Sequence, residues 1–276
     1  MTTVGFVGAG RMGSPMVERL VGAGHDVRVL CRTGEKGTAV EQLGATAVAD
    51  MAQVAEDADV VVVCVFSDDQ VREVCLSDGL VRHMARGASL VVHTTGSPRT
   101  VQTLAAQAPG ISVIDAPVSG GPHDIAAGRI TLFVGGDDAD VDKARPVLSC
   151  YGDPILHTGG LGSGQWVKLL NNTLLTAQLG LLREVTAFGS RVGVDEAGLI
   201  SAIQKGSGTS RAAEMVGARG SGSVGDFVAS ISEFLGKDVA VIREVTAETG
   251  HDLGILDGLL DRALGGGRNA PSESRI

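Results

Sequence analysis

The chain has 276 residues, of which 43% are apolar and only 3% aromatic, so its core must be built from valine, leucine, isoleucine and alanine. A net charge of −9 argues against a nucleic-acid-binding protein and against one that binds an anionic membrane surface. No basic and apolar leader precedes the first predicted strand, and no apolar run is long enough to span a bilayer, so we expect a cytoplasmic protein.

The first 160 residues alternate short valine-rich runs with amphipathic stretches, which predicts βαβ units and a parallel sheet. The predicted strands are Val4–Val7, Val27–Cys31, Val60–Val65, Ser89–Thr94, Ile111–Asp115 and Ile130–Val134. The clearest predicted helices are Arg11–Gly22, Glu35–Leu43 and Ser97–Ala106. The run at Val60 is almost continuously β-branched, as is typical of a central strand covered on both faces.

A glycine turn follows the first predicted strand. Gly8, Gly10 and Gly13 fit the pattern G-x-G-x-x-G, with Arg11 and Met12 between the last two glycines. The match gains specificity because a strand precedes it, a helix follows it, and a second strand comes next. We therefore predict that the turn and the helix N-terminus bind the pyrophosphate of a nicotinamide dinucleotide.

The end of the second predicted strand indicates which dinucleotide is preferred. NAD enzymes usually place an acidic residue there, whereas this chain has Arg32 and Thr33 after Cys31. Arg32 can pair with a 2′-phosphate and Thr33 can donate a hydrogen bond to it. We predict that NADP is the preferred cofactor, with NAD as the alternative.

The pattern changes after about Gly164. Residues from Gln165 to about Val192 form one long helical run, so rich in leucine that we expect it to be buried on much of its circumference. Helices broken by loops at Gly206–Gly208 and Gly217–Gly225 follow. We predict a Rossmann domain over residues 1–161, an all-helical domain for substrate binding and dimerisation over residues 162–264, and a disordered tail over residues 265–276.

The four cysteines, Cys31, Cys64, Cys75 and Cys150, form no C-x-x-C pair. We interpret them as reduced, buried thiols, and we expect no metal site.

Three further segments carry chemistry. They are Asp115-Ala116-Pro117-Val118-Ser119-Gly120-Gly121, the spacing Gly159-x-x-Gly162-x-Gly164-x-x-x-Lys168-x-x-x-Asn172, and Lys237-Asp238. Together with the N-terminal glycine turn they resemble the β-hydroxyacid dehydrogenase family, which includes 3-hydroxyisobutyrate dehydrogenase and tartronate semialdehyde reductase. The resemblance covers about residues 3–264. It implies hydride transfer between a nicotinamide and a small 3-hydroxy acid or semialdehyde, in a homodimer or homotetramer.

The resemblance also implies roles for individual residues. Lys168 is expected to be the general acid–base, and Asn172, one helical turn away on the same face, to bind the substrate. We expect burial and the helix N-terminus to lower the pKa of Lys168. Residues Ser119, Gly120 and Gly121 are expected to bind the substrate carboxylate. Contacts to the cofactor are expected from Val65, Thr95 and Lys237.

The chain departs from the family pattern in several places. Val65-Phe66 replaces a usual Leu-Pro pair, Thr94-Thr95 replaces Ser-Thr, and the polar loop expected at Pro122–Ile125 is atypical. Relative to the family pattern, the end of the C-terminal domain is shortened or diverged after Leu264. The length and Asn171 exclude a 6-phosphogluconate dehydrogenase. Two alternatives stay open: an imine reductase-like enzyme, which Lys168 disfavours, and a non-catalytic NADP-binding module.

Overall fold

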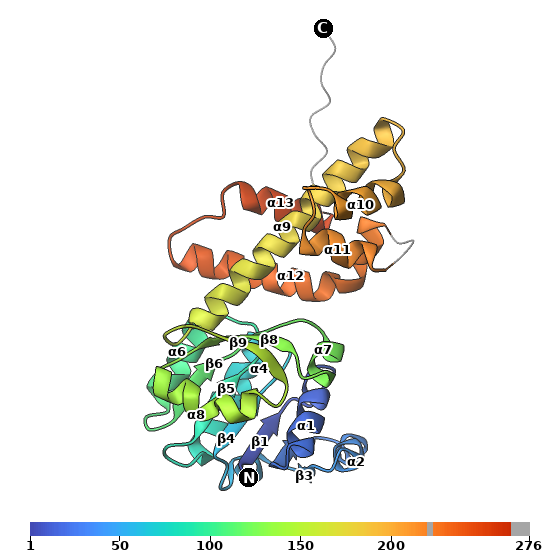
Figure 1. Ribbon diagram of the computed structural model, residues 1–276. Helices are drawn as coiled ribbons and strands as arrows, with labels where there is room; N and C mark the ends of the chain where they lie inside the picture. The colour runs from blue at the N-terminus through green and yellow to red at the C-terminus, as the bar shows by residue number, and fades with distance from the viewer. Residues whose placement is uncertain (220–222, 266–276) are drawn as a thin grey trace. The chain divides into compact units, whose positions relative to one another are not determined.

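The computed structural model describes residues 1–219 and 223–265 (Figure 1). The chain divides into two compact units, Met1–Lys168 and the residues from Leu169 onward. The predicted domain boundary, between residues 161 and 162, lies close to the start of the helix that contains Lys168. Within the described residues, no helix is long and apolar enough to cross a membrane. The tail predicted over residues 265–276 falls outside the described part of the chain after Gly265.

The first unit is built on a sheet whose six leading strands are parallel and follow the order β3-β2-β1-β4-β5-β6 of a dinucleotide-binding fold. The strands of the described residues are β1 (Thr3–Val7), β2 (Asp26–Leu30), β3 (Thr46–Val48), β4 (Val60–Val63), β5 (Ser89–Val92), β6 (Ser112–Asp115), β7 (Val118–Ser119), β8 (Ile130–Gly135) and β9 (Gly152–Gly159). The Rossmann prediction is confirmed.

Helices cover both faces of this sheet. They are α1 (Gly13–Gly22), α2 (Gly34–Gln42), α3 (Met51–Ala55), α4 (Asp68–Arg72), the π-helix η1 (Glu73–Ser77), α5 (Leu80–His83), α6 (Pro98–Gln107), α7 (Pro122–Ala126) and α8 (Asp138–Leu148). Strand β4 shows why both faces are covered. Val60 and Val62 pack into the cluster under α1, α2, α7 and α8, whereas Val61 and Val63 pack into the cluster under α3 to α6. Alternate side chains of one strand point to opposite faces, so an all-valine strand needs cover on both.

Part of the predicted sheet is corrected. The sheet is not parallel throughout, because β8 runs antiparallel to both β6 and β7. The short strands β3 and β7 and the edge strand β9 were not predicted. Most side chains of β9 are exposed or half-buried, so this strand lacks the apolar run that marked the others. The expected polar loop at Pro122–Ile125 is also wrong, since these residues form most of the helix α7.

The second unit is helical, as predicted. Its helices are α9 (Ser163–Arg191), which begins in the first unit, α10 (Glu196–Lys205), α11 (Arg211–Gly217), α12 (Val224–Glu248) and α13 (Ile255–Leu264). Side-chain caps fix where three of them begin: Asp195, Ser210 and Ser223 each accept a hydrogen bond from a backbone N–H in the first turn. Since α12 begins at Val224, the predicted loop at Gly217–Gly225 ends earlier than expected.

Helix α9 packs closely against α13. A Cβ on Gly180 would lie 2.3 Å from the carbonyl oxygen of Leu259, so only glycine allows this approach. The sequence predicted that α9 is buried on much of its circumference. This prediction is wrong for the described residues of the single chain. Five apolar side chains of α9 are 46–58% exposed. They are Leu170, Leu174, Leu181, Val185 and Phe188.

Candidate functional site

The glycine turn between β1 and α1 is shaped by two close contacts. Gly8 has a φ of +101°, and a Cβ there would lie 2.2 Å from the carbonyl oxygen of Cys64. A Cβ on Gly13 would lie 2.2 Å from the carbonyl oxygen of Gly8, so the third glycine lets α1 pack against the turn. Both positions therefore require glycine for the reasons that the motif predicts.

The second glycine faces open space instead. No heavy atom of the described residues lies within 4 Å of a Cβ placed on Gly10. No side chain caps α1 at Met12 either, although the Ser14 N–H already donates to the Gly10 carbonyl at 2.9 Å. An open approach to the backbone at an uncapped helix start fits the pyrophosphate of a dinucleotide.

Arg32 and Thr33 lie just beyond β2, as predicted, and both already have partners. The guanidinium of Arg32, 65% exposed, lies 3.5 Å from the Asp78 carboxylate. Thr33 caps α2 by accepting a hydrogen bond from the backbone N–H of Lys36 at 3.4 Å. An exposed ion pair contributes at most about 1 kcal/mol, so a phosphate can compete with Asp78 for Arg32.

The loops after β4 and β5 are hydrogen-bonded to each other. The hydroxyl of Thr94 accepts from the Val65 N–H at 3.0 Å and donates to the Val65 carbonyl at 2.9 Å. Val65 is therefore held through its main chain, and its N–H already has a protein partner. Thr95, the next predicted cofactor contact, is buried beside this pair.

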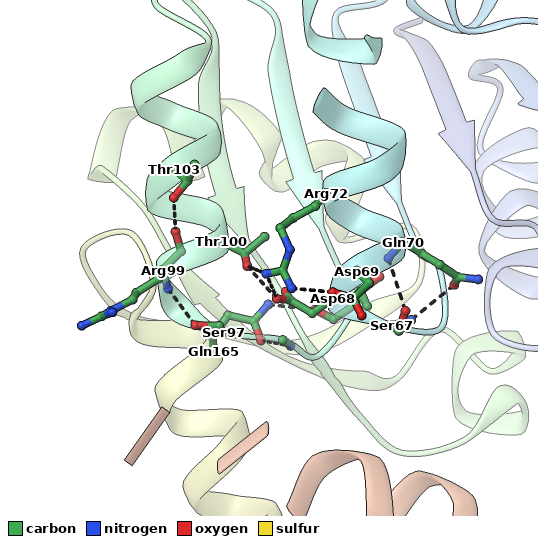
Figure 2. A network of polar contacts seen from close by, with 12 residues as sticks. Ser67, Asp68, Asp69, Gln70, Arg72, Ser97, Arg99, Thr100, Thr103 and Gln165 are labelled. Atoms are coloured by element: carbon green, nitrogen blue, oxygen red, sulfur yellow. Dashed lines mark hydrogen bonds and ion pairs between the residues drawn. The ribbon is translucent and has the colours of Figure 1, made fainter. Parts of the chain in front are cut away.

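A polar network in Figure 2 supports the same two loops from α4 and α6. The Thr100 hydroxyl donates to the Asp68 carboxylate at 2.6 Å, and Arg72 donates to Asp68, Asp69 and Thr100. Asp68 also packs on the loop after β5, because a Cβ on Gly96 would lie 2.0 Å from its Oδ1 atom. The sequence motifs gave no sign of this network.

The first turn of α9 is attached to the ends of β5 and β6. The buried carboxylate of Asp115 accepts from the backbone N–H groups of Gly162 and Gln165, both at 2.7 Å. Burial raises the pKa of Asp115, although the hydrogen bonds from Gly162 and Gln165 oppose that shift. Asp115 was part of a predicted motif, but this anchoring role was not predicted.

The predicted carboxylate-binding loop leaves β7 at Ser119. Gly120 has a φ of +133°, a conformation that favours glycine. The backbone N–H of Gly121 donates to the Asp124 carboxylate at 2.9 Å, which starts α7. One of the predicted donors to a substrate carboxylate therefore already holds a carboxylate of the chain itself.

The lysine predicted as acid–base lies in the second turn of α9. Lys168 is only 9% exposed, which is unusual for a lysine. It belongs to the first unit, whereas Asn172, one turn further along the same helix, belongs to the second.

Within the helical unit, Asn172 and Lys237 meet at one acidic residue. The Asn172 amide nitrogen donates to the buried Asp238 carboxylate, and the Lys237 ammonium lies 3.0 Å from the other oxygen of Asp238. Asp238 was quoted in a motif but was not predicted to hold these two residues together. The structure thus brings two predicted site residues into one cluster through a third.

His93 forms another buried polar contact of the first unit. Its two ring nitrogens lie 2.6 Å from the Ala116 carbonyl and 2.9 Å from the Tyr151 hydroxyl. Burial lowers the pKa of His93 to about 4, so the ring is neutral near pH 7. The cysteines are free thiols, but only Cys75 is fully buried. No group of three or more His, Cys, Asp or Glu side chains in residues 1–219 and 223–265 is placed to hold a metal ion.

Comparison with known proteins covers nearly the whole described chain. Residues 3–159 match the NAD binding domain of 6-phosphogluconate dehydrogenase, and residues 162–257 match the NAD-binding region of NADP-dependent 3-hydroxyisobutyrate dehydrogenase. The 3-hydroxyisobutyrate dehydrogenase of Pseudomonas aeruginosa is 35% identical over 211 residues, which are 75% of this chain and 71% of that protein.

Two solved structures are similar to this chain in fold. The 3-hydroxyisobutyrate dehydrogenase of Mycobacterium tuberculosis, solved with L-serine, has a TM-score of 0.84 and 27% identity, covering 95% of this chain and 92% of its own. An imine reductase of Streptomyces aurantiacus has a TM-score of 0.66 at 19% identity, covering 96% of this chain and 95% of its own. The second likeness shows the fold alone.

Proposed function

Because the chain belongs to the β-hydroxyacid dehydrogenase family, we propose that it interconverts a small 3-hydroxy acid and its semialdehyde with NADP as the preferred cofactor. It is an NAD(P)-dependent oxidoreductase. We assign nucleotide binding to residues 1–161, and substrate binding and assembly to residues 162–264.

The observation that carries the proposal is the buried lysine of α9. When bound, the nicotinamide supplies or accepts the hydride at the carbinol carbon. Lys168 donates a proton to the substrate oxygen in the reducing direction and takes it from the hydroxyl in the oxidising direction. A lysine without such a role is normally solvated, whereas Lys168 is 9% exposed on a helix whose start is fixed by Asp115.

The proposed NADP preference rests on the end of β2, where Arg32 stands without an acidic neighbour in the sequence. A 2′-phosphate accepts charge-assisted hydrogen bonds from a guanidinium, and it displaces the exposed Asp78 carboxylate from Arg32. Gly8, Gly10 and Gly13, with Arg11 and Met12, form the turn for the pyrophosphate. We propose that Val65, Thr95 and Lys237 line the remainder of the cofactor.

The substrate carboxylate is proposed to bind at Ser119 and Gly120, with Asn172 contacting the polar groups beside the reacting carbon. Gly121 contributes less than its place in the motif suggests, because its N–H already donates to Asp124. The Asp124 carboxylate already occupies the Gly121 end of this loop, so a substrate with two carboxylates would compete with it. We therefore expect small substrates that place a single carboxylate at Ser119.

The imine reductase alternative is weaker for this chain because Lys168 is present, and a non-catalytic module has no use for a buried lysine at that position. An activity screen of the purified protein separates these hypotheses. The panel pairs NADPH and NADH with short carboxylate-bearing semialdehydes and with cyclic imines, and pairs the oxidised cofactors with 3-hydroxyisobutyrate and L-serine. We expect turnover of a semialdehyde or hydroxy acid that is lost in Lys168→Ala. Imine reduction alone, or no turnover of any compound, contradicts the proposal.

We also propose that the exposed apolar face of α9 binds a second copy of this chain. Its members Leu170, Leu174, Leu181, Val185 and Phe188 follow one another at intervals of three, four or seven residues, which places them along one side of the helix. A row of exposed apolar side chains of this length is uncommon on a monomeric protein.

A further inference from the structure

Gln165 is a buried amide with no assigned role. It lies in the first turn of α9, is 1% exposed, and uses both ends of its side chain. Its Nε2 atom donates to the Thr94 carbonyl at 2.8 Å, and its Oε1 atom accepts from the Gly96 N–H at 3.0 Å. Figure 2 shows this side chain beside the Ser97 end of the loop after β5.

The two bonded groups flank a single residue. Thr95 lies between the Thr94 carbonyl and the Gly96 N–H, so one amide fixes the main chain on both sides of it. Thr95 is a proposed cofactor contact near the nicotinamide. On the helix, Lys168 follows Gln165 by three residues and so lies on the same side of α9.

Gln165 connects the first turn of α9 to the loop after β5, and further contacts hold both of these elements. The backbone N–H of Gln165 donates to the buried Asp115 carboxylate at 2.7 Å, which holds the helix turn on β6. Gly96 is backed by Asp68, with no room for even a methyl group between them. Asp68 is itself held by Thr100 and Arg72.

We infer that Gln165 is a positioning residue that sets the distance between Lys168 and the nicotinamide-side loop at Thr95. The inference rests on the proposed function, in which Lys168 moves the proton and the cofactor lies against Thr95. Hydride and proton transfer both depend on sub-ångström placement, and a shift of about 1 Å can lower a rate by roughly 100-fold.

The amide chemistry makes the inference testable with conservative variants. Only one orientation of the amide satisfies both partners, because the Thr94 carbonyl needs a donor and the Gly96 N–H needs an acceptor. Gln165→Glu keeps the acceptor but places a carboxylate oxygen against the Thr94 carbonyl. Gln165→Met keeps the length and burial of the side chain and removes both hydrogen bonds.

The experiment measures kcat, KM, NADPH affinity and the primary isotope effect with NADPH deuterated at the transferring position. Gln204→Met is the matched control, since Gln204 also donates its amide to a backbone carbonyl, that of Ala213, in the helical unit. We expect both Gln165 variants to lose about 10- to 100-fold in kcat with NADPH affinity within about threefold, and to show a larger isotope effect. The control should keep the unmutated values.

A purely structural role for Gln165 predicts a different result. The inference is overturned if kcat falls only in proportion to the concentration of NADPH-binding sites while the isotope effect is unchanged. It is also overturned if kcat is unchanged in both variants. Thermal denaturation of each variant shows whether it folds, and Gln165→Glu remains informative if Gln165→Met does not. If the unmutated protein turns over no substrate, the proposed function has failed; if it turns over and only Lys168→Ala is impaired, the inference alone has failed.

Discussion

In the nucleotide-binding unit, the two buried polar side chains that attach α9 to the sheet bind main-chain groups, whereas in the helical unit the polar side chains of the candidate site bind one another. Asp115 and Gln165 bind backbone N–H and carbonyl groups from buried positions. Asn172 and Lys237 instead meet through the carboxylate of Asp238. The first arrangement fixes the path of the chain, and the second fixes only the side chains relative to each other.

The two units also differ in how far their apolar side chains are covered by helices of the same chain. Both faces of the sheet are covered by helices of the same chain, so Val60 to Val63 are all buried. Helix α9 leaves a row of half-exposed leucine, valine and phenylalanine side chains that the described residues of its own chain do not cover. Helices of the first unit already cover both faces of its sheet, and we propose that a second copy of the chain covers the exposed face of α9.

The largest effect is expected from replacing Lys168, the last residue of the first unit. General acid–base catalysis contributes roughly 10²- to 10⁴-fold, so Lys168→Ala should lose turnover by about that factor while NADPH affinity changes little. Lys168→Arg should not restore activity, because a guanidinium does not release its proton near neutral pH. Steady-state kinetics and cofactor titration of the three proteins measure both quantities. Near-normal turnover in the alanine variant contradicts the role given to Lys168.

The apolar face of α9 tests whether the helical unit is incomplete. Leu174→Asp should weaken self-association by roughly two to four decades, since each copy loses a buried leucine and gains a buried charge. Sedimentation velocity across a concentration series measures the change. Ile255→Asp is the control, because Ile255 is 87% exposed on α13, outside the face of α9. A monomeric unmutated protein at micromolar concentration contradicts the proposed assembly.

His93 tests whether the buried contacts of the first unit carry its sensitivity to acid. Its pKa is about 4 when folded and about 6.5 when unfolded, so the unfolded chain takes up a proton first as the pH falls. Stability should therefore fall between about pH 6.5 and pH 4, by about 3 kcal/mol from this residue. Asp115, whose pKa is raised by burial, acts in the opposite direction over its own range.

Urea unfolding followed by the fluorescence of Trp166, the single tryptophan, reports on the first unit. His93→Gln should reduce the loss of stability in this pH range, whereas His251→Gln, at an exposed position of the helical unit, should keep it. Parallel pH profiles for all three proteins mean that another group is responsible.

The smallest expected effect is at the exposed end of β2. Arg32→Ala should weaken NADP binding by about one to two decades, because a charged hydrogen bond to phosphate contributes roughly 1.5–3 kcal/mol, and NAD binding should change much less. Arg28→Ala, within β2 and also paired with acidic side chains, is the control. Asp78→Asn should improve NADP affinity a few-fold by releasing Arg32. Equal affinity of the unmutated protein for NADP and NAD contradicts the preference.

The elements that could be predicted from the sequence are those with a periodic or sterically unique signature. The turn at Gly8 to Gly13 was predictable because a strand and a helix flank three glycines at the fingerprint spacing, and two of them, Gly8 and Gly13, are sterically required. The strand at Val60 was predictable from its apolar run. Strand β9 was missed because its edge position leaves it largely exposed, and α7 was missed because Pro122 and Asp124 are as common in loops as at helix starts.

The candidate site was predicted in part for a related reason. Lys168 and Asn172 stood out by their spacing on a helix, although their roles stay predictions. Gln165 was missed because its partners are the main chain of Thr94 and Gly96, and a backbone group has no residue type to recognise. Asp238 was missed because a carboxylate beside a lysine in sequence is most often a solvated pair.

The main-chain partners of Gln165 have a consequence for how this enzyme can diversify. An anchor that binds peptide groups is indifferent to the side chains of the loop that it holds, apart from Gly96, where Asp68 leaves no space. Drift at Ser97 can therefore change the side chains of that loop while the hydrogen bonds of Gln165 to Thr94 and Gly96 are kept. Directed evolution of substrate range should find its tolerated changes around Pro122 to Ala126, and should find few at Asp115 or Gln165.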